Sequence, residues 1–416
     1  MSVTDVCRAA AAAWAGVKWL TTARKNALLL DMAHAIEEHR EKIIAANDTD
    51  VAAAREAGIS TTLVDRLTLT ERRMGGLVSA IRTIADLPDP VGQVVGGWTR
   101  PNGLLVEQVR EPLGVVAVIY EARPNVTAEV AALCVKSGNC AVLRGSSMAM
   151  ATNTAIMAAL DSAIERYEDV PAAVVQLVTD PSREAALELM RAKEFVDLLV
   201  PRGGPELIDS VERNATVPTV IDGAGNCHVY IDGSADRDMA AAVAVNAKTS
   251  RPSVCNAMET LLVHEELARD WLPGVLDELA GAGVEIRGDA TVCEVWPKAV
   301  AAREEDWGTE YLDLVLAVRV VPDVTAAIAH IDRWGTSNAE AIVTRDIDVA
   351  RRFAREVDSG SVFVNTSTRY SDGGEYGYGV EIGVSTQKLH VRGPMGLAAL
   401  TTVKNVVWGT GQTRVV

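Results

Sequence analysis

Apolar side chains recur at helical spacing over residues 5–90 of the chain. Between Ala23 and Ala46 the apolar positions are Leu28, Leu29, Met32, Ile36, Ile43 and Ile44, with Glu37, Glu38 and Lys42 between them. Apolar residues three and four apart form one face of a helix. We therefore predict a helical region that ends at Leu87-Pro88-Asp89-Pro90.

Residues 91–110 have a different pattern, in which β-forming residues flank a turn at Arg100-Pro101-Asn102-Gly103. This arrangement predicts a hairpin. The tail from Asp372 is rich in glycine and then strand-like at Leu389–Val391 and Thr401–Val407. Isolated strands of this kind pair with another sheet, either across a subunit interface or in a ladder within the chain.

From Pro112 onward, short apolar strands alternate with helices. We predict strands at 115–120, 141–143, 174–178, 195–200 and 217–221, and helices at 127–137, 148–165, 182–192 and after Gly203-Gly204. Five strands with intervening helices form a doubly wound sheet, which binds ligands outside the carboxyl ends of its strands. The GxGxxG dinucleotide motif is missing, because Gly223-Ala224-Gly225 lacks the third position and precedes a strand.

A second α/β unit is predicted after Tyr230. Its helices are expected at 236–248, 265–280, 324–334 and 347–357, and its strands at 260–263, 284–286, 315–320, 341–343 and 361–364. A chain of 416 residues exceeds one hydrophobic core, so two or three domains are expected.

The net charge of −16 argues against a nucleic-acid or anionic-membrane partner, which needs a basic surface. No apolar run reaches the length of a membrane span, and the N-terminus lacks the basic region of a signal peptide. The six cysteines include no CxxC pair, which favours reduced thiols over disulfides or zinc. Cys227-His228 is interpreted as a buried strand cysteine beside a hydrogen-bonded histidine, and we expect a soluble, cytoplasmic protein without a metal site.

Cys255 stands out among these thiols, because it follows a predicted helix and precedes a predicted strand, in the loop Ser250-Arg251-Pro252-Ser253-Val254-Cys255. Nearby cations lower a thiol pKa and produce the reactive thiolate. Lys248 and Arg251 are the candidates for that effect. The alternative is an inert buried cysteine.

Several long blocks of the sequence resemble the gamma-glutamyl phosphate reductase family of the aldehyde dehydrogenase superfamily. They are YEARPNVTAEVAALCVKSGN (120–139), LLVPRGG (198–204), GNCHVYID (225–232), SRPSVCNAMETLLVH (250–264), SDGGEYGYGVEIGVSTQKLHVRGPMGLAALTT (371–402) and NVVWGTGQTR (405–414). The similarity covers essentially the whole chain. One departure is Asn338, in Gly335-Thr336-Ser337-Asn338-Ala339-Glu340, where the family commonly has a histidine.

The resemblance implies NADPH-dependent reduction of L-glutamate 5-phosphate to L-glutamate 5-semialdehyde, the second step of proline biosynthesis. It also implies an aldehyde-dehydrogenase-like α/β fold. That fold has a doubly wound NADP(H)-binding domain (1–92 and 113–230), an α/β catalytic domain (231–368), and a β oligomerisation hairpin with a C-terminal segment (93–112 and 369–416).

In this chemistry Cys255 is the nucleophile that forms a thioester, and Asn125 with the Cys255 backbone N–H stabilises the oxyanion. The alternative for Asn125 is a turn residue after Pro124. Hydrolytic relatives place a glutamate before a Gly-Gly pair to activate water. Here the matching stretch, Val220-Ile221-Asp222-Gly223-Ala224-Gly225, has no glutamate, so reduction is favoured over aldehyde oxidation. Asp222 is interpreted as a turn cap, with a role as base as the alternative.

Three residues are predicted to contact the cofactor. Arg144 and Ser146 follow the second strand, where an arginine modestly favours NADP over NAD, and Glu310 resembles the glutamate that holds the nicotinamide ribose. Glu310 could instead be a solvated loop acid.

Arg123, Arg251 and Arg369 are predicted to bind the substrate phosphate and carboxylate, or alternatively to form structural ion pairs. The Gly-rich segment 373–383 offers backbone N–H groups to phosphate, or is a tight linker.

Two alternatives remain. The first is another enzyme of the same superfamily, an aldehyde dehydrogenase or an acyl-CoA-linked reductase. The second is a non-catalytic binding scaffold. The expected associations are a homo-oligomer and contact with the glutamate 5-kinase that supplies the substrate.

Overall fold

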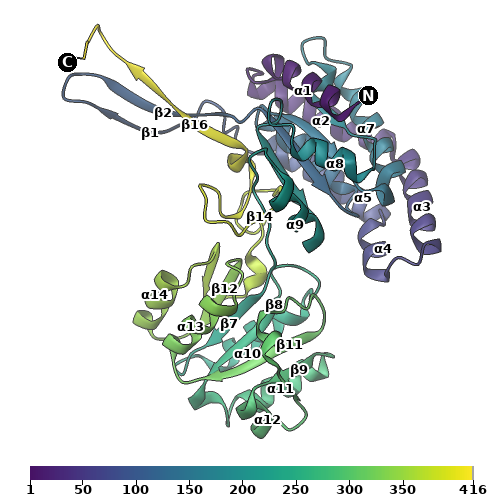
Figure 1. Ribbon diagram of the computed structural model, residues 1–416. Coiled ribbons are helices and arrows are strands. Elements are labelled where there is room, and N and C mark those ends of the chain that lie inside the picture. The colour runs from purple at the N-terminus through teal and green to yellow at the C-terminus, as the bar shows by residue number, and fades with distance from the viewer. Residues whose placement is uncertain (415–416) are drawn as a thin grey trace. The chain divides into compact units, whose positions relative to one another are not determined.

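The computed structural model describes residues 1–414 and divides them into two compact units (Figure 1). Unit 1 comprises Met1–Ile221, Gly377–Gly383 and the chain from Met395, and unit 2 comprises Asp222–Tyr376 and Val384–Pro394. The domain boundary expected at 230/231 falls inside strand β7 (Cys227–Ile231), whereas the compact units divide at 221/222.

Unit 1 begins with the predicted helical region. Its helices are α1 (Val3–Val17), α2 (Thr22–Glu38), α3 (Arg40–Glu56), α4 (Thr61–Leu67) and α5 (Glu71–Asp86). Ser2, Thr21, Ser60 and Thr70 cap four of them by accepting a backbone N–H. The periodic stretch 23–46 is two helices rather than one, because the backbone leaves helical geometry at His39.

A four-stranded parallel sheet forms the centre of unit 1, in the order β5-β4-β3-β6. Its strands are β3 (Val115–Tyr120), β4 (Cys140–Arg144), β5 (Val175–Leu177) and β6 (Leu198–Arg202), and the helices between and after them are α6 (Asn125–Lys136), α7 (Met150–Ile164), α8 (Arg183–Met190) and α9 (Pro205–Asn214). Helices α2, α5, α6 and α7 contact one another in one group, and α1, α8 and α9 in another. Every residue of β3 is buried, as the apolar run predicted.

The prediction of a fifth strand at 217–221 is wrong. This segment makes a single bridge, Thr219 to Leu199 of β6, and two backbone hydrogen bonds with the same residue. Pro218 has no N–H to donate, so a regular ladder cannot extend through it.

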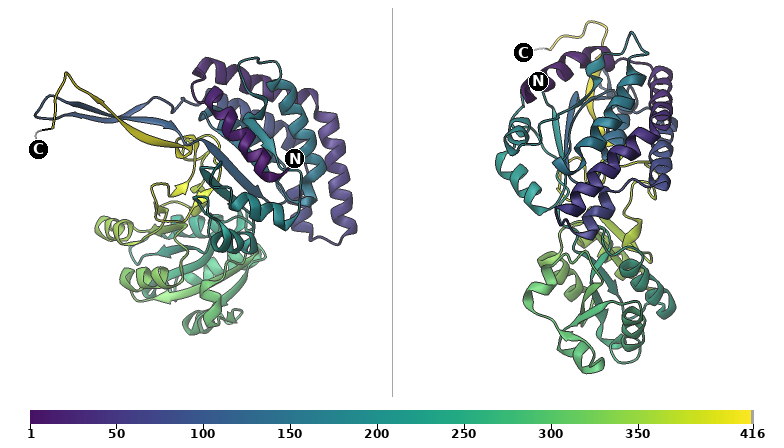
Figure 2. Two further views of the ribbon diagram at one scale, coloured as in Figure 1. Left: turned by 45° about the horizontal axis from the view of Figure 1, so that its top comes forward. Right: turned by 90° about the vertical axis from the view of Figure 1, so that its right-hand side faces the viewer.

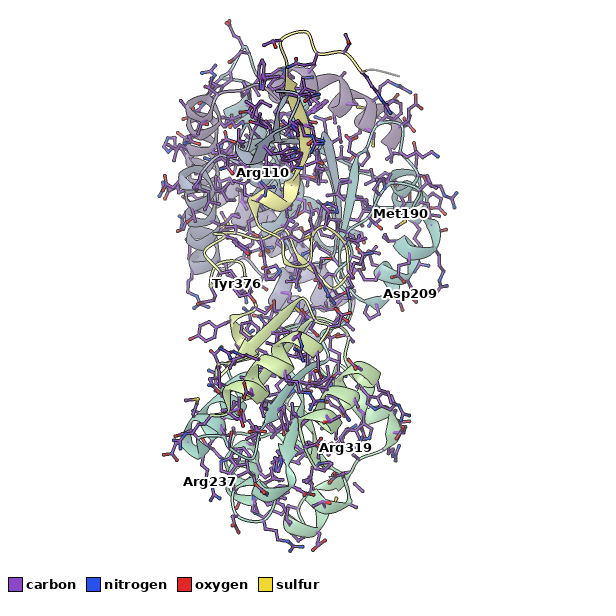
Figure 3. All side chains as sticks on the ribbon, turned by 90° about the vertical axis from the view of Figure 1, so that its left-hand side faces the viewer. Arg110, Met190, Asp209, Arg237, Arg319 and Tyr376 are labelled. Carbon is purple, nitrogen blue, oxygen red and sulfur yellow. The ribbon has the colours of Figure 1, made fainter. Side chains whose placement is uncertain are left out.

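The predicted hairpin is present as β1 (Val94–Thr99) and β2 (Leu105–Pro112), and the predicted terminal strand is β16 (Thr401–Trp408). These strands form an antiparallel sheet in the order β1-β2-β16, so the ladder lies within the chain. Arg110 of β2, labelled in Figure 3, donates to the Thr401 hydroxyl of β16 at 3.1 Å. Figure 2 shows no helix against either face of this ribbon, and Trp98, Val407 and Trp408 are exposed.

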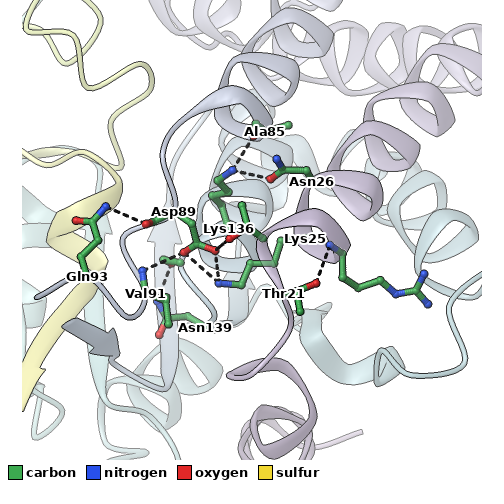
Figure 4. Close-up of polar contacts among 12 residues, drawn as sticks. Thr21, Lys25, Asn26, Ala85, Asp89, Val91, Gln93, Lys136 and Asn139 are labelled. Carbon is green, nitrogen blue, oxygen red and sulfur yellow. Dashed lines mark hydrogen bonds and ion pairs between the residues drawn. The ribbon is translucent and has the colours of Figure 1, made fainter. Parts of the chain in front are cut away.

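Two buried lysines fix the segment that leads into the ribbon (Figure 4). Lys25 of α2 pairs with Asp89 at 3.0 Å, and Asp89 accepts the Val91 N–H. Lys136 of α6 donates to Asn26 Oδ1 and to the Ala85 carbonyl, both at 2.6 Å. Burial lowers the pKa of Lys136. These contacts join α2, α5 and α6 to the start of the hairpin.

Unit 2 contains a seven-stranded parallel sheet in the order β10-β9-β11-β8-β7-β12-β13. Besides β7 its strands are β8 (Met258–His264), β9 (Glu285–Gly288), β10 (Val300–Ala301), β11 (Val315–Val321), β12 (Ala339–Val343) and β13 (Ser361–Val364). Its helices are α10 (Arg237–Thr249), α11 (Leu272–Gly281), α12 (Ala290–Val295), α13 (Val324–Trp334) and α14 (Ile347–Glu356).

Alternate residues of the central strands enter two separate cores. Val229, Leu261 and Val263 pack with α10 and α11, whereas Tyr230 and Leu262 pack with α13 and α14. The sheet is therefore covered on both faces, which explains the continuous apolar runs of its strands.

Three details of unit 2 differ from the sequence predictions. The helix predicted at 265–280 is a short 3₁₀ turn (Glu265–Leu267) followed by α11, because Pro273 occupies the first helical turn. The elements α12 and β10 were not predicted. The strand predicted at 389–391 is wrong, because these residues lie in a bend between β14 (Val384–Ser385) and β15 (Gly393–Pro394).

Among the described residues, no helix combines the length and the apolar character that a membrane crossing requires.

Candidate active site

Cys255 lies in a tight turn between α10 and β8. The Ala257 N–H donates to the Val254 carbonyl at 3.0 Å, which places Cys255 and Asn256 at the two central positions of a β-turn. Cys255 is half-buried, whereas Cys7, Cys134, Cys140 and Cys227 are buried, and all are free thiols. Of the six cysteines, only Cys255 and Cys293 are therefore partly exposed.

The backbone of this turn is in close contact with the start of β7. A Cβ built on Gly225 would lie 2.0 Å from the Cys255 carbonyl oxygen, so only glycine fits. The same oxygen accepts the Cys227 thiol at 3.2 Å and the Asn338 side-chain amide at 2.8 Å. Three residues that lie far from Cys255 in the sequence thus surround its carbonyl.

Two arginines predicted to bind substrate come together beside Cys255. Arg251 is exposed, and the half-buried Arg369 donates from Nε to the Ser250 hydroxyl at 3.1 Å. Burial and, second, the charge of Arg251 lower the pKa of Arg369, while the Cys255 thiolate acts in the opposite direction. Two neighbouring guanidinium groups near a thiol form an arrangement suited to an anionic substrate.

Lys248 has a different partner from the one expected. Its ammonium lies 2.5 Å from the Glu259 carboxylate, and neither side chain is exposed. Burial lowers the pKa of Lys248 and raises that of Glu259 to about 7, and their mutual attraction opposes both shifts. Since Glu259 compensates the Lys248 charge, Arg251 and Arg369 are the cations left to stabilise the Cys255 thiolate.

Glu310 is connected to the same region of unit 2. Its Oε1 accepts the Gly225 N–H at 2.8 Å, immediately beside the contact of Gly225 with Cys255. The following segment is fixed by Glu259, whose Oε1 accepts the Leu312 N–H at 3.1 Å. Glu310 is therefore part of an ordered network and is not an isolated loop acid.

His228 corrects one sequence interpretation. Cys227 is buried in β7 as expected, but neither ring nitrogen of His228 has a hydrogen-bond partner among residues 1–414. Instead, the His228 backbone N–H donates to Glu340 at 2.9 Å, and its ring packs edge-on against His330. Burial lowers the pKa of His228 to about 4, so its ring is neutral near pH 7.

In unit 1, Arg123 and Asn125 follow the carboxyl end of β3. Asn125 begins α6, and its side-chain amide donates one N–H to Glu129 Oε2 at 2.9 Å. Burial raises the pKa of Glu129 to about 7, against the opposing effects of Asn125 and of the Arg202 and Arg123 charges. An asparagine amide has two N–H donors, and Glu129 is the acceptor that the described residues provide for one of them.

Arg144 and Ser146 lie at the carboxyl end of β4. The Arg144 Nη2 donates to the carbonyls of Pro181 and Ser182, at 2.6 and 3.0 Å, in the loop after β5. Its buried Nε has no hydrogen-bond partner within residues 1–414. The Ser146 hydroxyl accepts the Ala122 N–H at 3.5 Å.

Sequence reasoning missed several participants in these networks. Glu129 and Glu259 were hidden within helix and strand patterns, and Asn338 was noted only as a departure from the family. In the Gly-rich segment, the Gly374 N–H bonds to Asp372, and Gly379 passes close to Leu87 with a φ of +79°.

Comparisons with known proteins agree with this architecture. The model of the "Aldehyde dehydrogenase family" matches residues 1–292. Gamma-glutamyl phosphate reductase of Carboxydothermus hydrogenoformans is 52% identical over 395 residues, which cover 95% of both chains. The enzyme of the same name from Thermobifida fusca is 51% identical over 412 residues, 99% of this chain and 98% of that one.

Solved structures give the same result for the fold. The crystal structure of gamma-glutamyl phosphate reductase from Thermotoga maritima matches all of both chains with a TM-score of 0.97 and 44% identity. An acetylating aldehyde dehydrogenase from Geobacillus thermoglucosidasius shares the fold at a TM-score of 0.68 and 18% identity. The predicted α/β fold is thus confirmed, and the chain belongs to the aldehyde dehydrogenase family and, within it, to the gamma-glutamyl phosphate reductases.

Proposed function

We propose that this protein reduces L-glutamate 5-phosphate to L-glutamate 5-semialdehyde with release of phosphate, using NADPH, in the second step of proline biosynthesis. The observation that supports this most is the turn that presents a half-buried Cys255 beside Arg251 and Arg369. Half of this chain's residues are identical to those of enzymes named for that reduction, over nearly the full length.

The first step is attack of the Cys255 thiolate on the acyl carbon. The carbon–sulfur bond forms, the bond from carbon to the phosphate oxygen breaks, and phosphate leaves with the bonding electrons. Because phosphate is a good leaving group, no strong general acid is required. The product is a glutamyl thioester on Cys255.

Negative charge develops on the carbonyl oxygen during this attack. Asn125, through its second N–H, and the Cys255 backbone N–H are the proposed donors, each worth about 3 kcal/mol in the transition state. Glu129 holds the first N–H of Asn125 and so fixes the orientation of its amide.

NADPH, when bound, supplies the hydride that reduces the thioester carbon. Cys255 then leaves as thiolate when the carbon–sulfur bond breaks and the carbonyl of the aldehyde reforms. Arg251 and Arg369 stabilise this thiolate by their charge. The residue immediately before Gly223 is Asp222 and not a glutamate. This suits release of the aldehyde without activation of water.

We assign cofactor binding to Arg144, Ser146 and Glu310. The buried Arg144 Nε, a cationic donor without a partner among the described residues, fits a ligand that carries phosphate. It lies at the carboxyl edge of a parallel sheet, where such folds bind nucleotides. The NADP(H)-binding role is therefore proposed for 1–92 and 113–230, and the catalytic role for 231–368.

Arg123, Arg251 and Arg369 are proposed to bind the phosphate and carboxylate of the substrate. Because the net charge is −16, an anionic ligand needs guanidinium groups in its site, and Arg251 and Arg369 supply two of them in unit 2.

The ribbon β1-β2-β16 is proposed as an interface for a homo-oligomer, because its outer strands leave Trp98, Val407 and Trp408 exposed. Residues 93–112 and 369–416 are assigned to this element. We also propose that the protein is cytoplasmic and associates with the glutamate 5-kinase that produces its labile substrate.

A coupled assay in the reverse direction tests the function. With glutamate semialdehyde, the protein should reduce NADP⁺ only when inorganic phosphate is present, and phosphate should be consumed in equal amount. Reduction that needs coenzyme A, or proceeds without phosphate, would assign the chain to another activity of the same superfamily. No NADP⁺ reduction in any of these mixtures would favour a binding scaffold.

A further inference from the structure

We infer that Asn338 is a positioning residue for the nucleophile, because its side-chain amide holds the central peptide of the Cys255 turn in one orientation. This inference rests on the proposed function of Cys255. It assigns a role to Asn338, at the position where the resemblance implies a histidine.

The contact itself is short, and the Asn338 side of it is buried. Asn338 is 1% exposed, and its Nδ2 donates to the Cys255 carbonyl oxygen at 2.8 Å. The buried Cys227 thiol is a second, weaker donor to the same oxygen, at 3.2 Å. This carbonyl is therefore directed toward buried donors that lie at the starts of β7 and β12.

The peptide that these donors hold is the flexible part of a β-turn. Type I and type II turns differ mainly by a flip of the peptide between their two central residues, here Cys255 and Asn256. A type II turn needs positive φ at its second central residue, and asparagine tolerates that conformation. Asn256 does not have positive φ in the observed turn, so the flipped form is an alternative that this sequence permits.

The other end of the turn is fixed by a different set of contacts. The Asn256 carbonyl accepts the Thr368 hydroxyl at 2.7 Å, and the Asn256 side chain donates to the Ser371 carbonyl at 2.9 Å. These bonds do not involve the Cys255 carbonyl, whose described donors are Asn338 and Cys227.

Asn338 is suited to this task because its own backbone is fixed. The Asn338 carbonyl accepts the Ser361 N–H at 3.0 Å, and the preceding Ser337 carbonyl accepts the Gly360 N–H at 3.0 Å. Ser337 adopts a φ of +60°, which brings the chain into β12 directly after Asn338. A donor on so rigid a base can hold its acceptor in a defined geometry.

The orientation of this peptide affects the thiolate. In a trans peptide the N–H points opposite to the C=O, so the Asn256 N–H is directed away from Asn338 and Cys227. A flip would replace this partial positive charge by the partial negative charge of the Cys255 carbonyl. The inference therefore includes the premise that the Cys255 thiolate lies on the N–H side of this peptide, where the observed orientation favours its negative charge.

The test compares Asn338→Leu, which keeps the branching and the number of side-chain heavy atoms but removes the donor, with Asn338→His, which restores an N–H donor. The first readout is the rate at which iodoacetamide alkylates Cys255 between pH 6 and 10. The alkylated fraction is measured by mass spectrometry of the Cys255 peptide, and the peptide with the partly exposed Cys293 is the internal reference. The second readout is kcat and KM in the coupled assay.

For Asn338→Leu we expect alkylation of Cys255 at pH 7.5 to slow at least fivefold, with a midpoint moved to higher pH, while Cys293 reacts unchanged. The kcat should fall at least tenfold with KM within twofold of the parent. Asn338→His should recover at least a third of both rates, and Cys227→Ala should have a smaller effect than Asn338→Leu.

Asn47→Leu is the matched control for loss of a buried amide. Asn47 is also 1% exposed and donates to a backbone carbonyl, that of Leu67 at 2.9 Å, but it lies in unit 1. It should lower the melting temperature and leave alkylation of Cys255 unchanged.

The inference is overturned if iodoacetamide alkylates Cys255 in Asn338→Leu at least as fast as in the parent. It is also overturned if the alkylation rate and the kcat of Asn338→His are no higher than those of Asn338→Leu. Because alkylation needs no substrate, this result is independent of whether the parent protein reduces an acyl phosphate.

Discussion

The two parallel sheets of this protein present their candidate residues at opposite edges. In unit 1, Arg123 and Asn125 follow β3 and Arg144 ends β4, so these residues lie at the carboxyl edge. In unit 2, Cys255 and Asn338 precede β8 and β12, and thus lie at the amino edge. The rule that ligands bind at the carboxyl ends of strands applies to the first sheet only.

The contrast extends to how the residues are held. At the carboxyl edge of unit 1, side chains are fixed mainly by other side chains and by neighbouring loops, as Asn125 is by Glu129 and Arg144 is by Pro181. At the amino edge of unit 2, the backbones of Gly225 and Cys255 are in direct contact. We infer that Cys255, the proposed nucleophile, is positioned by close main-chain contact as well as by the Asn338 amide, so its surroundings should tolerate change less than those of the proposed cofactor site.

The largest effect is expected when the nucleophile itself is replaced. Cys255→Ser should lower kcat by about 10⁴-fold or more, because a serine hydroxyl is far less acidic than a thiol and is a weak nucleophile at its ordinary pKa. The binding of NADPH, measured by fluorescence titration, should remain. Appreciable reductase activity in this variant would remove Cys255 from the mechanism.

Gly225→Ala tests the backbone contact directly. The added Cβ would lie 2.0 Å from the Cys255 carbonyl oxygen, so the turn must move. A displacement of about 1 Å in a nucleophile can cost about 10²-fold in rate. We expect a loss of kcat of that size, measured in the coupled assay.

Gly274→Ala serves as the control for this prediction, because a Cβ on Gly274, in α11 of the same unit, would meet no atom within 4 Å. It should keep parental activity. Equal kinetics in both variants would contradict the main-chain account of unit 2.

Asn125→Ala is the corresponding test at the edge of unit 1. Loss of one oxyanion donor should lower kcat by about 10²-fold, with the dissociation constant of NADPH within about twofold of the parent. Steady-state kinetics and a binding titration separate these quantities. Unchanged kcat would leave Asn125 with the role of a helix-start residue only.

The smallest expected effect is on the free energy of unfolding, and it concerns Glu340, a buried carboxyl group in unit 2. Burial raises the pKa of Glu340 from 4.5 to about 7. The folded state therefore holds this proton more tightly than the unfolded chain, and the free energy of unfolding falls as the pH rises from about 4.5 to about 7. Glu340→Gln should remove this loss.

We expect Glu340→Gln to raise the free energy of unfolding by about 1 to 2 kcal/mol at pH 8, and to give little gain at pH 4.5. Denaturant unfolding at the two pH values measures it. Glu278→Gln, on the exposed side of α11, is the control that should show no such difference. A gain independent of pH would point to packing rather than to ionisation.

Local patterns in the sequence were sufficient for most of the fold. Periodic apolar residues located the helices of 5–90, and the ranges predicted for α13 and β13 agree with the structure. The failures have specific causes, such as Pro218, which interrupts a ladder, and Pro273, which starts a helix late. Residues 389–391 are apolar enough for a strand but lie in a bend.

The surroundings of the candidate site were harder to predict, because they depend on contacts between distant segments. Lys248 was expected near the thiol, but it pairs with Glu259, and both are fully buried. Asn338 is 83 residues away from Cys255, and no sequence pattern indicates that its amide reaches the Cys255 carbonyl. The roles predicted for Cys255, Asn125 and the arginines stay predictions.

The most direct measurement is the mass of the protein after mixing with L-glutamate 5-phosphate in the absence of nucleotide. We expect one added glutamyl group, located on Cys255 by peptide mapping, lost on treatment with hydroxylamine, and converted to free semialdehyde when NADPH is added. A glutamyl group on another residue, or no adduct in a protein that still reduces the substrate, would contradict it.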